Sequence, residues 1–301
     1  MKRILLVFSL MVCLLVAGQT VCFADTVSIE SADDPGFSGG SIAVPFADSN
    51  WASSPDFNSA ADTPLALSAD ESAAISARQT ELAQALRVSA QSSTSLYSVL
   101  DETNDADWDQ STLESLATPS VIPATMWYCA VKLPCYDQKR TPYCGPFSTY
   151  QILRYMGSSE PDLMKHLISE MYIPGQGSSI YRLARSLNKR LYFTYMVSDV
   201  GSATDYAYKH VVDIRNHKMP LDNLVRIQGG KFGHYQHYHA GHFLDSNGYY
   251  FDSARRFGYI LATDTYNERN ESGGHTLGPH WIPFWQMHRG VVLHPRHKVV
   301  W

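Results

Sequence analysis

The chain has few cysteines, five among 301 residues, and this scarcity excludes a fold held together by many disulfide bonds. Cys13 and Cys22 lie in the first 24 residues, so only Cys129, Cys135 and Cys144 remain beyond them. Three is an odd number, so at least one of these thiols stays free. Cys129 and Cys135 are the plausible bridged pair, and Cys144 is the thiol left over.

Long hydrophobic runs are absent beyond the N-terminus, where residues 1–24 hold Lys2, Arg3, an apolar run and small residues ending at Ala24. This layout predicts a secretory signal peptide cleaved after Ala24, because the run is too short and poorly flanked for a membrane span. We expect a secreted protein with no membrane span once the signal is removed.

Basic residues are scarce between residues 25 and 125, where 16 acidic residues face only Arg78 and Arg87. The net charge is −14 there and +7 over residues 126–301. Because the acidic target of the basic part lies on the same chain, we expect no nucleic-acid partner. The composition predicts an acidic, largely disordered pro-region or linker at 25–125 and a globular domain at 126–301.

One helix is predicted inside the acidic segment. Ser68 and Glu71 have the spacing of a capping box, and Ile75, Leu82 and Leu86 fall near one face of the helix that follows. If the segment is an intramolecular pro-region, we expect this helix to supply the apolar contact by which it covers the domain at 126–301.

The domain at 126–301 is predicted to place its helices before its strands, which indicates an α+β fold. Helices are expected at about 146–156, 160–171 and 178–189. Strands are expected at 190–197, 221–227, 239–246, 249–254, 259–264 and 290–294, with a hairpin at Asn247-Gly248.

Cys144 stands at the start of a predicted helix in "YDQKRTPYCGPFSTYQILRYMG". A helix N-terminus lowers the pKa of a thiol, and Pro146 suits the first helical position. Gly145 would let the backbone approach a substrate. The amide of Gln138, six residues upstream, could join the Cys144 N–H in holding an oxyanion.

The segment "LPCYDQKRTPYCGPFSTYQILRYMG" resembles the nucleophile region of secreted papain-like cysteine peptidases of the bacteriocin-processing, double-glycine leader peptidase type. The resemblance covers residues 126–301, with Leu133 for the usual Val and Phe147 for a small residue. It implies a papain-like fold, a peptide or protein substrate, and a thiol nucleophile with a histidine base, an aspartate and an oxyanion-hole glutamine. No cofactor is implied.

Histidine is absent before residue 166, so the catalytic base must come from the second half, which holds all twelve histidines. The family carries its histidine at a strand start, followed by an aromatic residue and later a glycine. "HFLDSNGYYF" matches this pattern with His242 first, and His239 and His237 remain as alternatives.

For the residue that orients the base, the family has an aspartate at the end of the next strand, which here is Asp264. Asp252 competes, because the hairpin predicted at Asn247-Gly248 would pair its strand with that of His242. Both aspartates therefore stay open.

The sequence contains neither a His-Glu-x-x-His motif nor a Cys-x-x-Cys pair. The cluster of His234, His237, His239 and His242 still permits a second class of function, a secreted metal-binding protein, since imidazoles bind zinc, copper and nickel. A third possibility is a papain-fold amidase or acyltransferase acting on cell-wall peptides.

Overall fold

The computed structural model describes residues 64, 66–91, 126–139, 141–174, 177–192, 194–252, 257–268 and 276–301. The predicted signal peptide at 1–24 and most of the acidic segment lie outside these residues. In the described part, no helix has both the length and the apolar character needed to cross a membrane.

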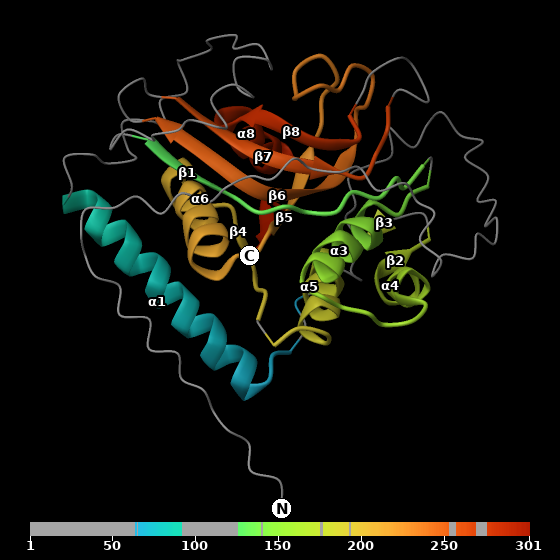
Figure 1. Cartoon of the computed structure of the whole chain (residues 1–301), viewed down its shortest axis with the longest axis horizontal. Coiled ribbons are helices and arrows are strands. Elements are labelled where there is room, and N and C mark those ends of the chain that lie inside the picture. The colour runs from blue at the N-terminus through green and yellow to red at the C-terminus, as the bar shows by residue number, and fades with distance from the viewer. Residues whose placement is uncertain are drawn as a thin grey trace, which may run out of the picture.

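An antiparallel sheet forms the centre of the molecule (Figure 1). Its strands run in the order β4-β9-β5-β6-β7-β8, and β1 pairs with the second half of β6. They are β1 (Met126–Ala130), β4 (Val197–Asp199), β5 (Leu221–Arg226), β6 (Gly241–Asp252), β7 (Phe257–Asp264), β8 (Gly278–Pro283) and β9 (Lys298–Val300). A separate two-stranded sheet joins β2 (Tyr172–Ile173) to β3 (Gly177–Ser178).

Helices pack around this sheet in two groups. α3 (Cys144–Tyr155), α4 (Leu163–Met171) and α5 (Ile180–Asn188) share one apolar core with Leu224 and Phe243 of the sheet. α6 (Ala203–His210), the π-helical segment η3 (Val211–His217) and α8 (Phe284–Leu293) share a second core with Val225 and Leu244. Neighbouring strand residues contribute to different cores because side chains alternate between the faces of a strand. The predicted α+β class is confirmed.

β6 is one continuous strand of 12 residues, so the two strands and the hairpin predicted at Asn247-Gly248 are wrong. The chain passes through these residues with a β-bulge between Ser246 and Gly248. A Cβ atom at Gly248 would lie 2.8 Å from the Ala130 Cβ and 3.0 Å from the Leu261 Cβ. Glycine is therefore needed here because neighbouring strands approach closely, and not because the chain turns.

Other elements also differ from the sequence prediction. The predicted strand 290–294 lies largely in the helix α8, and the predicted strand 190–197 contributes only Val197, the first residue of β4. α6, η3, β8 and β9 were not predicted. Short apolar runs such as "GVVLH" fit a strand or a buried helix equally well, so their periodicity does not decide between them.

The helix predicted in the acidic segment is present as α1 (Ala69–Gln91). Its capping box forms, with the Ser68 N–H donating to Glu71 Oε2 at 2.8 Å and the Glu71 N–H donating to Ser68 Oγ at 3.2 Å. Ile75, Leu82 and Leu86 pack against the core that α6 and η3 share. α1 lies beside α6, on the opposite side of the molecule from α4 (Figure 1).

A buried ion pair fixes α1 to the rest of the chain. The Arg78 guanidinium donates to the carboxylate of Asp213 in η3, whose side chain is fully buried, and stacks 5.4 Å above the ring of Trp301. Closer to the surface, Glu81 Oε2 contacts His217 Nε2 at 2.7 Å. These contacts attach α1 firmly, and none of their members is a predicted catalytic residue.

We expect the substitution Arg78→Ala to lower the free energy of unfolding by about 3–5 kcal/mol, because removing one member of a buried ion pair leaves the other charge uncompensated. Urea denaturation followed by circular dichroism measures this change. Arg87→Ala is the matched control, since Arg87 is exposed on the same helix, and its effect should stay within about 0.5 kcal/mol. Equal effects of the two substitutions would contradict the assignment.

Candidate active site

Cys144 is the first residue of α3, and its thiol is partly buried where this helix meets the sheet. Ile152 and Leu153 on the following turns are fully buried and anchor the helix in its core. The sulfur lies against the backbone N–H groups of Phe243 and Gly145. The thiol is thus placed beside the residue that directly follows His242.

Gly145 lies where the first turn of α3 packs closely against β3 and β6. A Cβ atom at this position would lie 2.6 Å from the Ser178 Cβ and 3.3 Å from the Phe243 ring. The first turn of α3 therefore fits against β3 and β6 only when residue 145 has no side chain.

His242 and Asp264 are in direct contact. His242 lies at the start of β6 and Asp264 at the end of β7, and both side chains are buried. The His242 Nε2 and Asp264 Oδ1 atoms are 2.7 Å apart, whereas the buried His242 Nδ1 has no hydrogen-bond partner within the described part of the chain. The imidazole is therefore fixed through one nitrogen and leaves the other as an open proton acceptor.

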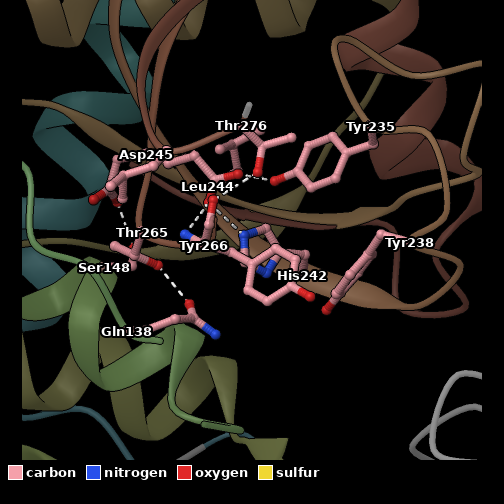
Figure 2. Close-up of polar contacts among 12 residues, drawn as sticks. Gln138, Ser148, Tyr235, Tyr238, His242, Leu244, Asp245, Thr265, Tyr266 and Thr276 are labelled. Carbon is pink, nitrogen blue, oxygen red and sulfur yellow. Dashed lines mark hydrogen bonds and ion pairs between the residues drawn. The ribbon is translucent and has the colours of Figure 1, made fainter. Parts of the chain in front are cut away.

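Asp264 is itself held by two further donors. The Tyr235 hydroxyl donates to its Oδ2, and the Tyr266 N–H donates to its Oδ1 at 2.9 Å. Tyr238 and Tyr266 both pack against the His242 ring and against each other, with their own ring centroids 5.2 Å apart (Figure 2). Their ring centroids lie 5.5 and 6.3 Å from that of the imidazole. Aromatic side chains thus limit the positions that the imidazole can adopt.

The alternative candidates for the base and the orienting aspartate lie away from the His242–Asp264 pair. Asp252 ends β6, ten residues beyond His242, which corresponds to about 33 Å along an extended strand. His237 and His239 are exposed on the loop before β6, and the His239 Nδ1 accepts from the Gly229 N–H at 3.3 Å. The structure therefore brings only His242 and Asp264 of these candidates into contact.

The four histidines proposed as a metal site do not converge. His234 packs against His280 with ring centroids 4.6 Å apart, and His242 contacts Asp264 instead. Among the described residues, no group of three or more His, Cys, Asp or Glu side chains is arranged to hold a metal ion.

Burial shifts the pKa of Cys144, His242 and Asp264 in the direction that favours the neutral form. It raises the pKa of the Cys144 thiol to about 11, although the N–H groups of Phe243 and Gly145 act in the opposite direction. Burial also lowers the pKa of His242 to about 3 and raises that of Asp264. Burial therefore outweighs the helix start and favours the neutral thiol, whereas the sequence predicted a lowered thiol pKa.

Gln138 is buried, and its side-chain amide is held at both ends. Its Nε2 donates to the Thr141 carbonyl at 2.9 Å, and its Oε1 accepts from the Thr265 hydroxyl at 2.6 Å (Figure 2). Thr265 directly follows Asp264, so Gln138 lies next to the end of the strand that carries the aspartate.

The predicted disulfide is not present. Cys129 and Cys135 are both buried free thiols. Cys129 belongs to β1, with its sulfur 3.8 Å from the Ile214 carbonyl oxygen, and the Cys135 thiol donates to the Asp264 carbonyl at 3.4 Å. The two sulfurs therefore face different parts of the core.

Two residues that shape the site were not found from the sequence. Tyr235 supports Asp264, and the buried Glu268 accepts the N–H groups of residues 236, 237 and 238 at 2.7–2.8 Å. Glu268 thereby holds the loop that carries Tyr235 and Tyr238. The aromatic cluster "YQHYH" was a visible signal for Tyr235, but no local pattern marks Glu268.

A pair of buried carboxyl groups lies one helical turn beyond Cys144. The Ser148 hydroxyl lies 2.6 Å from Asp222 Oδ2 and also contacts Asp245 Oδ1. The other oxygen of Asp245, Oδ2, accepts from Gln151 Nε2 at 2.8 Å. One hydroxyl carries a single proton, so a carboxyl group must supply the second hydrogen bond. Burial raises the pKa of both aspartates, that of Asp222 to about 7.

Comparison of the chain with protein-family models, with curated proteins and with solved structures finds no match. The assignment of a function therefore rests on the residues of this site.

We expect alkylation of Cys144 by iodoacetamide in the free protein to accelerate about tenfold per pH unit between about pH 6 and 9. The reason is that the thiolate is the reactive form and the pKa of the thiol lies near 11. Peptide mass spectrometry assigns the modified cysteine at each pH. A rate that stays constant over this range would reveal a preformed thiolate–imidazolium pair instead.

The carboxyl pair predicts a loss of stability as the pH rises. Folded Asp222 binds its proton up to about pH 7, whereas an unfolded aspartate releases it near pH 4, so the folded chain binds more protons in this window. The free energy of unfolding should fall by up to about 1.4 kcal/mol per pH unit from this group. Asp222→Asn should flatten the pH profile obtained by urea denaturation. An unchanged slope would contradict proton sharing.

Proposed function

We propose that this chain is an exported papain-like cysteine peptidase that hydrolyses amide bonds of a peptide or protein substrate. In this proposal α3, α4 and α5 form the nucleophile side of the fold, and the antiparallel sheet carries the base. The catalytic residues are Cys144, His242, Asp264 and Gln138.

One observation supports the proposal most strongly. His242 is bound through Nε2 to the buried Asp264, its Nδ1 has no hydrogen-bond partner in the described structure, and the next residue along the strand contacts the Cys144 sulfur. A thiol nucleophile needs a neighbouring base that is itself oriented by a third group. The free protein shows no hydrogen bond between the thiol and His242, and such contacts often tighten only when the substrate binds.

The reaction would begin with attack of the Cys144 sulfur on the substrate carbonyl carbon. The thiol proton passes to His242 Nδ1, so that a neutral pair becomes charged only as the new C–S bond forms. Asp264 stabilises the resulting imidazolium through Nε2. The Cys144 N–H, which has no acceptor within its own helix, and the Gln138 Nε2 group donate to the oxyanion.

The second half of the reaction would release both products. The tetrahedral intermediate collapses, the C–N bond breaks, and the amine leaves with the proton from Nδ1. Water then attacks the thioester, gives a proton to the same nitrogen, and releases the carboxylic acid together with the restored Cys144 thiol.

The signal peptide and the pro-region stay predictions, because both lie largely outside the described residues. The helix α1 packs against η3 and α6, so it does not supply the contact at the site that the sequence predicted. In this proposal the acidic charge of residues 25–125 supplies the attraction of the pro-region. A segment of that charge would be attracted to the basic domain, and salt would weaken the attraction.

We expect Cys144→Ala to abolish hydrolysis of a fluorogenic peptide library while the fold persists. His242→Ala should lower kcat/KM by at least about 10³-fold, because the proton of the attacking thiol loses its acceptor. His237→Ala and His239→Ala are matched controls in the adjacent loop and should change the rate less than about threefold. Wild-type activity in Cys144→Ala would refute the proposed function.

A further inference from the structure

Gln138 and Thr265 are joined by two hydrogen bonds although they lie 127 residues apart. The Gln138 N–H donates to the Thr265 carbonyl at 2.7 Å, and the Thr265 hydroxyl donates to Gln138 Oε1 at 2.6 Å. Both residues are buried, with exposed fractions of 4% and 1%. Because water has little access to this contact, the hydroxyl is the donor that satisfies the amide oxygen.

The two partners of the Gln138 side chain determine which way its amide points. The Thr141 carbonyl can only accept a hydrogen bond, so it must face the NH₂ group. The amide oxygen then faces Thr265, whose hydroxyl can donate. An exchanged orientation would place two carbonyl oxygens against each other. In the observed orientation, Nε2 keeps a second hydrogen, which the proposed mechanism assigns to a substrate oxygen.

The same contact connects the two sides of the site. Thr265 follows Asp264, which holds His242, and Gln138 lies in the segment that leads to Cys144. Cys135, in that segment too, donates to the Asp264 carbonyl at 3.4 Å. The position of the oxyanion donor is therefore linked directly to the position of the base.

We propose that Thr265 is a positioning residue that fixes the Gln138 amide as an oxyanion donor and keeps it in register with the His242–Asp264 pair. This inference rests on the proposed function, since it assigns a role within the same reaction. Thr265 itself touches no reacting atom, because its hydroxyl is used by the Gln138 oxygen.

The test compares Thr265→Val, which keeps the shape and loses the hydroxyl, with Thr265→Ser, which keeps the hydroxyl. With Val, the buried amide oxygen has no donor and the amide rotates. We expect kcat on a fluorogenic peptide library to fall about 10- to 100-fold in Thr265→Val, with KM changed less than about threefold, the scale for disturbing one oxyanion donor. Thr265→Ser should recover at least about half of the wild-type kcat.

Two further readouts separate positioning from general damage. Alkylation of Cys144 by iodoacetamide forms no oxyanion, so its rate should be unchanged in Thr265→Val. The double variant with Gln138→Ala should be no slower than Gln138→Ala alone, because both changes remove the same interaction. The inference would be overturned by a wild-type kcat in Thr265→Val or by a kcat in Thr265→Ser that is as low as in Thr265→Val. It would also be overturned by slowed alkylation in Thr265→Val or by additive losses in the double variant. Failure of the proposed function would show differently, as activity that survives Cys144→Ala.

Discussion

The hydrogen bond between His242 Nε2 and Asp264 Oδ1 is the interaction on which the account of the site depends. It forms because β6 and β7 are antiparallel neighbours and the two side chains lie near the end of their paired region. A shift of one residue in this register would send one of the side chains to the opposite face of the sheet. The apolar residues Leu244 and Ala262 occupy the same core and oppose such a shift. Burial of the hydrophobic face thus also fixes the polar contact.

The nucleophile side is held to the sheet by buried polar groups. Ser148 and Gln151 on α3 contact the carboxyl groups of Asp222 and Asp245 on β5 and β6. An incomplete network of this kind would be costly, because each buried polar atom left without a partner loses the hydrogen bonds that water gave it. The orientation of the helix that begins at Cys144 is therefore set by contacts within two turns of the thiol.

Local sequence predicted the parts of the site that depend on short-range patterns. The Cys144 helix, the α1 capping box and the strands around His242 and Asp264 follow from spacing, capping and alternation. The sequence could not show that Asn247-Gly248 lies inside a strand, because only the approach of β1 and β7 to Gly248 makes that possible. Glu268 was equally hidden, since its partners are backbone N–H groups 30–32 residues away. The free state of Cys129 and Cys135 also depends on long-range packing.

The most direct test of the central claim is labelling of the full chain with a thiol-directed epoxide, followed by mass spectrometry of the peptides that contain Cys129, Cys135 and Cys144. The measurement is made with and without a chelator. The account predicts an adduct on Cys144 alone, formed at the same rate with chelator, and hydrolysis of a peptide substrate that is strongly slowed in His242→Ala because the attacking thiol loses its proton acceptor. No adduct on Cys144, or wild-type hydrolysis in His242→Ala, would contradict the assignment of Cys144 as the nucleophile and His242 as its base.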